Sequence, residues 1–354
     1  MRGRLLAVLA ATVLAFLALE FGFRAFGPRP YKRPTLRDEQ GRIVDLGNVI
    51  AFFRDDGAQA SSEPRNGIKP GFHARFCYDR PRWDYFDADG CVDVSINALG
   101  FRDEEFPLAK PPGEYRVLAI GDSFTFAQGC RAEDGWTEVL EGLLERRRGG
   151  PVQVMNAGFT GGGSWPPEYA PWVLAHALDF EPDLVIYGMC LNDMDRRVPM
   201  LAWEKVWDDP AALGAPWLGG RSALLNYVQV RRRQAQLLAA RPPDAGLLIA
   251  ADPGPWNQSQ EALRAIHAHL AGAGVPFLIA VFPMLSLLGE GYPYASLHAA
   301  ATRFCAGEGI DAVDLYPRFA GLRDRDLWVH PYDQHPNPVA HRLFAEGIDA
   351  HLAR

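Results

Sequence analysis

The stretch Val-Leu-Ala-Ile-Gly-Asp-Ser at residues 117–123 decides the fold of this chain of 354 residues. Four apolar residues followed by a glycine are typical of a buried strand that leaves a parallel sheet at its carboxyl edge. Open α/β sheets place their ligands at this edge. Ser123 is therefore predicted to lie at the mouth of a ligand site, where its hydroxyl can serve as a nucleophile.

Strand-like and helical segments alternate along the chain from residue 115 onward. The candidate strands are 115–120, 152–155, 183–188, 276–282 and 311–314, and the candidate helices are 136–147, 167–178, 257–273 and 338–353. Such alternation implies right-handed crossovers and a parallel sheet with helices on both faces. Residues 194–250 interrupt the alternation and are predicted to be an insertion above the carboxyl edge, with a helix over 222–240.

The first 27 residues are predicted to form a membrane segment. Arg2 and Arg4 precede an apolar run from Leu5 to Leu19, which places the positive end in the cytoplasm. The run is nearer to a signal-peptide core than to the about 20 residues of a full span. However, no clear small-x-small cleavage site follows it. We therefore expect an inner-membrane anchor with the rest of the chain in the periplasm or outside the cell, and secretion after signal cleavage is the alternative.

A proline-rich joint at residues 107–113 divides the remaining chain, because consecutive prolines prevent regular structure. Residues 28–112 are rich in Pro, Gly, Asp and aromatic residues, and are predicted to be an irregular extension that packs on the main domain, residues 113–354. Of the five cysteines, Cys77 and Cys91 are the only close pair in sequence. They would close a small loop in an oxidising compartment.

Composition and charge argue against two classes of site. A net charge of −7 gives no support to nucleic-acid binding. The sequence has no CxxC motif and no His/Cys cluster with zinc-site spacing, so no structural metal is expected. No cofactor is expected either, and the sequence leaves protein partners open.

Four separate stretches carry the residue types that acyl transfer by serine requires. These are a nucleophile, a base, a group that orients the base, and donors aimed at the developing oxyanion. The stretches are Gly121-Asp-Ser-Phe-Thr125, Asn156-Ala-Gly-Phe-Thr-Gly-Gly-Gly163, Cys190-Leu-Asn-Asp193 and Asp333-Gln-His-Pro-Asn337. The glycines of the second stretch let backbone N–H groups approach a ligand closely.

In this order and spacing, the four stretches resemble the SGNH or GDSL family of esterases and lipases, over the whole main domain. The resemblance implies that Ser123 is the nucleophile, His335 the base and Asp333 the group that orients the base. It also implies an oxyanion hole made by the backbone N–H groups of Ser123 and Gly161 and the side-chain amide of Asn192. The upstream run at 96–103 is similar to the segment that precedes the catalytic domain in membrane-anchored bacterial members.

Of the residues that carry this resemblance, Asp333 departs most from the family's usual spacing. The family's usual last block has its aspartate three residues before the histidine, whereas Asp333 is two residues before His335. Asp314, at the end of the last candidate strand, is the alternative carboxylate. His330 and His341 are rivals for the base, although His341 is expected to be a packing residue on the final helix.

We therefore predict a membrane-anchored SGNH-like hydrolase with a flavodoxin-like three-layer α/β/α sandwich and a parallel sheet. It would cleave O-acyl groups through an acyl-enzyme on Ser123, acting on a small-molecule, lipid or glycan ester. O-acyl groups on envelope or exported polysaccharide are the leading substrate class. The alternatives are an acyltransferase to exported polysaccharide and a non-catalytic glycan-binding or assembly protein.

Overall fold

The computed structural model describes the chain except for residues 1, 28–33, 45–69, 160–164, 199–221, 240–243, 290 and 332. The chain divides into two compact units. The smaller unit contains residues 1–33 and 202–241, and the larger contains residues 34–201 and 242–354.

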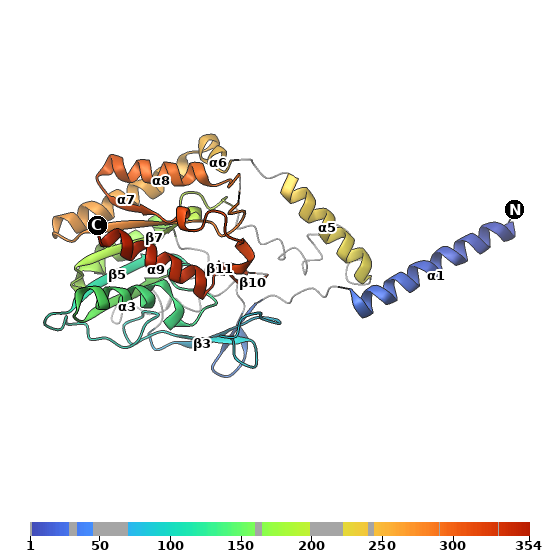
Figure 1. The fold of residues 1–354 in the computed structure, drawn as a ribbon, viewed down its shortest axis with the longest axis horizontal. Coiled ribbons are helices and arrows are strands. Elements are labelled where there is room, and N and C mark those ends of the chain that lie inside the picture. The colour runs from blue at the N-terminus through green and yellow to red at the C-terminus, as the bar shows by residue number, and fades with distance from the viewer. Residues whose placement is uncertain are drawn as a thin grey trace. The chain divides into compact units, whose positions relative to one another are not determined.

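A five-stranded parallel sheet forms the centre of the larger unit (Figure 1). Its strands are β5 (Tyr115–Gly121), β6 (Val152–Gly158), β7 (Leu184–Cys190), β8 (Phe277–Phe282) and β9 (Asp311–Asp314). They lie in the order β6-β5-β7-β8-β9, and every neighbouring pair is parallel. This is the flavodoxin-like order, which reverses direction next to the first strand and so opens a crevice at its carboxyl end. The predicted fold class is confirmed.

Helices cover both faces of this sheet. The helices are α3 (Trp136–Arg148), α4 (Pro166–His176), α6 (Gly246–Ala251), α7 (Gly254–Gly272), α8 (Ala295–Glu308) and α9 (Pro338–Leu352). α3 packs against α9, and α4 packs against α7. Figure 1 shows α7 and α8 together, away from α3. Every residue of β7 and β8 is buried, as expected for strands covered on both sides.

An antiparallel sheet forms in part of the extension. Its strands are β1 (Thr35–Asp38), β2 (Ile43–Val44), β3 (His73–Cys77) and β4 (Cys91–Ser95), in the order β2-β1-β3-β4. The prediction of an irregular extension is corrected for these strands. They are two to five residues long, so the Pro, Gly and Asp residues between them dominate the composition and hide the alternation of buried and exposed side chains. Cys77 and Cys91 pair in register on β3 and β4 and form a disulfide.

The extension shares a hydrophobic core with the main domain. Apolar residues of β3, β4 and the segment between them pack together with Phe126, Ala127 and Cys130, which follow Ser123, and with Val329. A late two-stranded sheet, formed by β10 (Trp328–His330) and β11 (Asp333–Pro336), borders the same core. The extension therefore packs beside both sequence stretches that were predicted to supply the nucleophile and the base.

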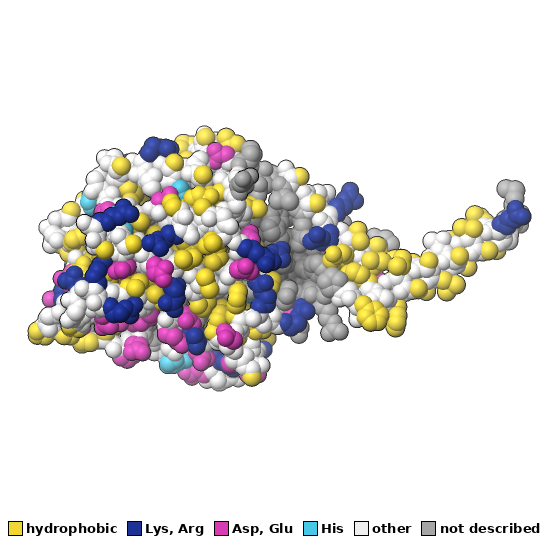
Figure 2. Space-filling model, viewed as in Figure 1, with side chains coloured by type: hydrophobic (Ala, Val, Ile, Leu, Met, Phe, Trp, Pro, Cys, Tyr) yellow, Lys and Arg dark blue, Asp and Glu magenta, His cyan; other side chains and the backbone are white. Residues whose placement is uncertain are grey.

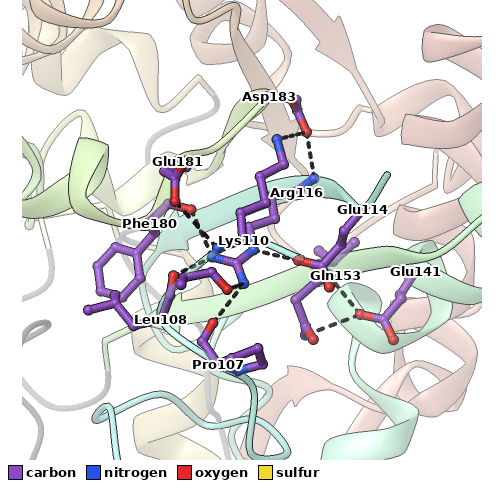
Figure 3. Close-up of polar contacts among 12 residues, drawn as sticks. Pro107, Leu108, Lys110, Glu114, Arg116, Glu141, Gln153, Phe180, Glu181 and Asp183 are labelled. Carbon is purple, nitrogen blue, oxygen red and sulfur yellow. Dashed lines mark hydrogen bonds and ion pairs between the residues drawn. The ribbon is translucent and has the colours of Figure 1, made fainter. Parts of the chain in front are cut away.

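Arg116 fastens the proline-rich joint to the main domain (Figure 3). Its side chain is fully buried and donates hydrogen bonds to the carbonyl oxygens of Pro107 at 2.7 Å, Leu108 at 2.7 Å and Phe180 at 3.2 Å. Glu114 accepts a further bond at 2.5 Å and balances the charge. A buried cation needs such partners, so the joint is held in one geometry.

The smaller unit contains α1 (Arg2–Phe26) and α5 (Ala223–Ala239), so the predicted helix over 222–240 is confirmed. Apolar side chains are exposed along α1, as Figure 2 shows. By length and composition this helix can cross a membrane, a test that a signal sequence also passes. Near its end, the Glu20 carboxylate accepts hydrogen bonds from Ser222 Oγ at 2.7 Å and from the backbone N–H groups of Ala223 at 2.8 Å and Leu224 at 3.1 Å. Glu20 thus caps the first turn of α5.

Candidate active site

The turn after β5 places Ser123 at the carboxyl edge of the sheet. Gly121 has φ +155°, and a side chain there would meet Thr125 Oγ1 and the carbonyl of Gly188. A side chain at Gly158 would meet the backbone nitrogen of Phe126. Because both positions are glycine, the turn lies directly on the ends of β6 and β7.

A buried arginine from the extension holds the turn that follows Ser123. The guanidinium of Arg102 donates to the carbonyl oxygens of Phe126, Ala127 and Cys130, each at 2.5 Å. Burial lowers the pKa of Arg102 to about 10, so the group is still a cation at neutral pH. The only sequence signal for this residue was its place in the run at 96–103, which resembles the segment upstream of the catalytic domain in related proteins.

Ser123, His335 and Asp333 meet at this edge. His335 Nε2 lies 2.9 Å from Ser123 Oγ, and His335 Nδ1 lies 2.5 Å from Asp333 Oδ1. Asp333 and His335 are both in β11, and residues two apart in a strand point to the same face. The two-residue offset therefore suits an extended loop segment, and it lets the backbone N–H of His335 also donate to Asp333 Oδ1 at 3.2 Å.

The side-chain amide of Asn192 lies beside the same turn, in the short 3₁₀ turn Leu191–Asp193 that follows β7. It interacts with the Asp122 carboxylate, which accepts the backbone N–H of Phe124 at 2.8 Å. Burial raises the pKa of Asp122 to about 6, so this group is mainly ionised at neutral pH. An amide nitrogen carries two hydrogens, so Asn192 can face Asp122 and still donate to a ligand. Gly161 lies outside the described residues.

Asp193 anchors the turn that carries Asn192. Its carboxylate accepts the Tyr187 hydroxyl at 2.6 Å and the backbone N–H of Cys190 at 3.1 Å, and its carbonyl accepts Ser259 Oγ at 2.6 Å. Burial and the nearby charge of Asp122 raise the pKa of Asp193. This carboxyl therefore serves the local structure, and it fixes the backbone from which Asn192 projects.

The rival residues have other partners. His330 Nε2 lies 2.9 Å from the carbonyl oxygen of Asp79. His341 is fully buried on α9, and burial, followed by the charge of Arg102, lowers its pKa to about 3. Asp314 Oδ1 lies 2.7 Å from Nδ1 of a different histidine, His298. The structure therefore brings His335 and Asp333 together with Ser123. The three rival residues have other partners.

Tyr78 is a contact of this group that the sequence did not indicate. It comes from the extension, immediately after β3, and its hydroxyl donates to Asp333 Oδ2 at 3.0 Å. No motif surrounds it, and 255 residues separate the two partners. Among the described residues, no group of three or more His, Cys, Asp or Glu side chains is arranged to hold a metal ion.

Comparison with known proteins identifies the family. The sequence profile of the GDSL-like Lipase/Acylhydrolase family matches residues 119–343, well over half of the chain. Similar solved structures include the psychrotrophic esterase EstA from a Pseudoalteromonas species, at 15% identity over 67% of this chain and 96% of that one, with a TM-score of 0.41. Another is a catalytic mutant of Axe2, an acetylxylan esterase from Geobacillus stearothermophilus, at 13% identity over 68% of this chain and 94% of that one, with a TM-score of 0.42. No curated protein matches the chain. The chain belongs to the GDSL-like lipase/acylhydrolase family and is a serine ester hydrolase.

Proposed function

We propose that the protein cleaves carboxylic esters through an acyl-enzyme on Ser123, with His335 as the base and Asp333 as the group that orients it. The observation that carries the proposal is the line of contacts from Ser123 Oγ to His335 Nε2 at 2.9 Å, and from His335 Nδ1 to Asp333 Oδ1 at 2.5 Å. This is the geometry that a serine nucleophile needs, because a base must take its proton as it attacks.

The two half-reactions use the same groups. Ser123 Oγ attacks the ester carbonyl carbon while His335 Nε2 takes the serine proton, and Asp333 stabilises the imidazolium through Nδ1–H. The imidazolium then gives its proton to the departing alkoxide, which leaves as an alcohol. Water, deprotonated by the same nitrogen, releases the acyl group as a carboxylic acid and restores Ser123.

Three donors are assigned to the oxyanion in this proposal. They are the backbone N–H groups of Ser123 and Gly161 and the side-chain amide of Asn192. The position of Asn192 supports its part, since Asp122 and the anchored turn of Asp193 hold it beside Ser123. The Asp122 carboxylate would orient this amide without touching the substrate.

Asn192→Ala is expected to lower kcat by about 10²–10³, the usual loss for one oxyanion donor. KM should change little, because the bond strengthens only as charge develops on the oxygen. Steady-state kinetics on a short-chain aryl ester measures both. Asn226→Ala, on α5 of the smaller unit, is the matched control and should leave kcat unchanged. A loss below tenfold for Asn192→Ala would remove it from the oxyanion hole.

The experiment that tests the proposed nucleophile directly is labelling by a serine-reactive fluorophosphonate. The full-length protein should be labelled once, at Ser123, and the Ser123→Ala variant should not be labelled. Mass spectrometry of the labelled peptide locates the site. Labelling of Ser123→Ala at the wild-type rate would overturn the proposal.

We also propose that α1 remains in the protein as a membrane anchor and that the rest of the chain lies outside the cytoplasm. Arg2 and Arg4 at the start of the helix support this orientation. The contacts of Glu20 with the first turn of α5 tie the end of α1 to a later segment of the chain and so fit a helix that stays in the protein. The Cys77–Cys91 disulfide supports an oxidising compartment.

A reporter that is active only outside the cytoplasm should be active when fused to the C-terminus. The protein should also stay with membranes after alkaline washing, because an apolar helix of this length partitions into lipid. Leu17→Ala with Leu19→Ala is the control, since these changes put small residues before Glu20 at a signal-peptidase spacing and should release the chain. A soluble, shortened wild-type protein would show that the segment is a cleaved signal.

O-acyl groups on envelope or exported carbohydrate are the substrate class that fits this location. An acyl-enzyme can pass its acyl group to a sugar hydroxyl as well as to water, so acyl transfer to an exported polysaccharide uses the same site. Product analysis with acylated and free oligosaccharides together separates the two outcomes. Release of free acid alone supports hydrolysis, and appearance of acyl groups on the acceptor supports transfer.

A further inference from the structure

The extension reaches the carboxylate of the proposed triad through one side chain. Tyr78 is buried, and its hydroxyl donates to Asp333 Oδ2 at 3.0 Å. The other carboxylate oxygen, Oδ1, faces His335 Nδ1 at 2.5 Å. The histidine therefore contacts one oxygen of Asp333 and the extension contacts the other.

Neighbouring contacts keep Tyr78 in place. Its ring packs edge-on against Phe86 with the ring centres 5.4 Å apart, and it lies 5.3 Å from the ring of His330. Close to it in sequence, Trp83 Nε1 donates to the carbonyl of Trp328 at 2.7 Å. Trp328 and His330 belong to β10, which pairs with the strand that carries Asp333.

The hydroxyl of Tyr78 can act towards Asp333 only as a donor while it keeps its proton. Burial, followed by the charge of Asp333, raises the pKa of Tyr78 well above its usual value. The group is therefore neutral at any pH at which an esterase would be assayed. A phenol that donates to one carboxylate oxygen restricts rotation of the carboxylate and stabilises it in one orientation.

We propose that Tyr78 is a positioning residue of the active site, whose hydroxyl holds Asp333 so that the carboxylate orients His335. The inference rests on the proposed function and goes beyond it, because it makes the extension a working part of the catalytic unit. Tyr78 acts through Asp333 and does not touch the reacting atoms. Removing its hydroxyl should leave substrate binding unchanged and lower the rate of the chemical step.

Other titratable groups also face Asp333 or His335. The groups that interact electrostatically with one of these two residues are Tyr78, Tyr85, Asp122, Cys130, His330 and His341. Asp122 has a pKa of about 6 and therefore titrates in the range of the acid limb of an esterase pH profile. It is unchanged in a Tyr78 variant, so a shift of that limb between wild type and variant reports the effect of the Tyr78 hydroxyl.

Tyr78→Phe is the test, with the full-length protein and a short-chain aryl ester. We expect kcat to fall about tenfold, the usual scale for a hydrogen bond to a charged group, with KM within about twofold. Without its donor the Asp333 carboxylate attracts the imidazolium proton more strongly, so the acid limb of the kcat/KM profile should move to higher pH. Tyr85→Phe is the matched control, because Tyr85 is on the same extension, stacks on Phe86 and lies near Asp333, but its neutral hydroxyl does not hydrogen-bond the carboxylate. It should leave the acid limb in place.

A double-mutant cycle separates positioning from a merely structural role. In an Asp333→Asn background, Tyr78→Phe should change kcat less than about twofold, since its partner has lost the charge. An equal loss in both backgrounds, with no shift of the acid limb, would overturn the inference. If Tyr78→Phe does not fold, a fluorotyrosine at position 78 keeps the ring and is a stronger donor. It should move the acid limb to lower pH, and an unmoved limb would likewise overturn the inference.

The two proposals fail in different ways. A folded wild-type protein that neither hydrolyses esters nor reacts with a fluorophosphonate contradicts the proposed function. An active wild type in which Tyr78→Phe matches Tyr85→Phe in kcat and in pH profile contradicts only the role of Tyr78.

Discussion

Ser123→Ala is expected to abolish hydrolysis of short-chain aryl esters, with a loss of about 10⁶ in kcat, and His335→Ala should lose a similar factor. The reason is that the hydroxyl and the imidazole make one proton-transfer unit, with 2.9 Å between Ser123 Oγ and His335 Nε2. Without the hydroxyl there is no acyl-enzyme, and without the imidazole the hydroxyl keeps its proton. Purified full-length variants assayed by initial rates provide the measurement.

The double variant Ser123→Ala with His335→Ala tests whether the two side chains act as one unit or contribute independently to kcat. It should be no slower than either single variant, because members of one triad are strongly non-additive. His351→Ala is the matched control for the histidine, since His351 is on α9 and contacts Asp311 at 2.9 Å. Its kcat should equal that of wild type. Retained activity in a folded Ser123→Ala or His335→Ala protein would contradict the assignment.

The main sheet was predictable because four of its five strands, β5 to β8, are almost entirely buried. All residues of β8 are buried, so the strand is one continuous apolar run in the sequence. Its predicted bounds of 276–282 differ from Phe277–Phe282 by one residue. α8 was not among the predicted helices. Its buried positions include His298 and Ala301 as well as larger apolar residues, so the apolar stripe is weak in the sequence.

The placement of Asn192 beside the turn of Asp122 and Ser123 was also predictable, because parallel strands bring their carboxyl ends to one edge of a sheet. The geometry of the stretch at residues 333–337 was not predictable from the sequence. Asp333 reaches His335 because both lie in the extended strand β11, which exists through its pairing with β10 and not through a pattern of its own. Tyr78 depends on how the extension packs, and such long-range contacts leave no local periodicity in the sequence.

Asp333→Asn should lower kcat by at least about a hundredfold and by as much as about 10⁴, the loss found for the corresponding change in a well-studied serine protease. The carboxylate fixes the imidazole tautomer by accepting Nδ1–H at 2.5 Å and stabilises the imidazolium during attack. An amide in its place can present an N–H to Nδ1, which favours the wrong tautomer. The remaining carbonyl oxygen of the asparagine can still accept the hydrogen bond from Tyr78, so the fold should survive.

Asp314→Asn is the matched control, because the same change is made on the carboxylate that the sequence left as an alternative. Asp314 Oδ1 contacts His298 Nδ1 at 2.7 Å and accepts the backbone N–H of Tyr316 at 2.9 Å. Its replacement should lower the free energy of unfolding by about 1 kcal/mol and leave kcat within about threefold. Thermal unfolding and initial rates, measured on the Asp333→Asn and Asp314→Asn variants, show which of the two carboxylates orients the base. If Asp314→Asn is folded and inactive while Asp333→Asn is nearly normal, then Asp314 orients the base in solution, and Asp333 only terminates the β10–β11 pair.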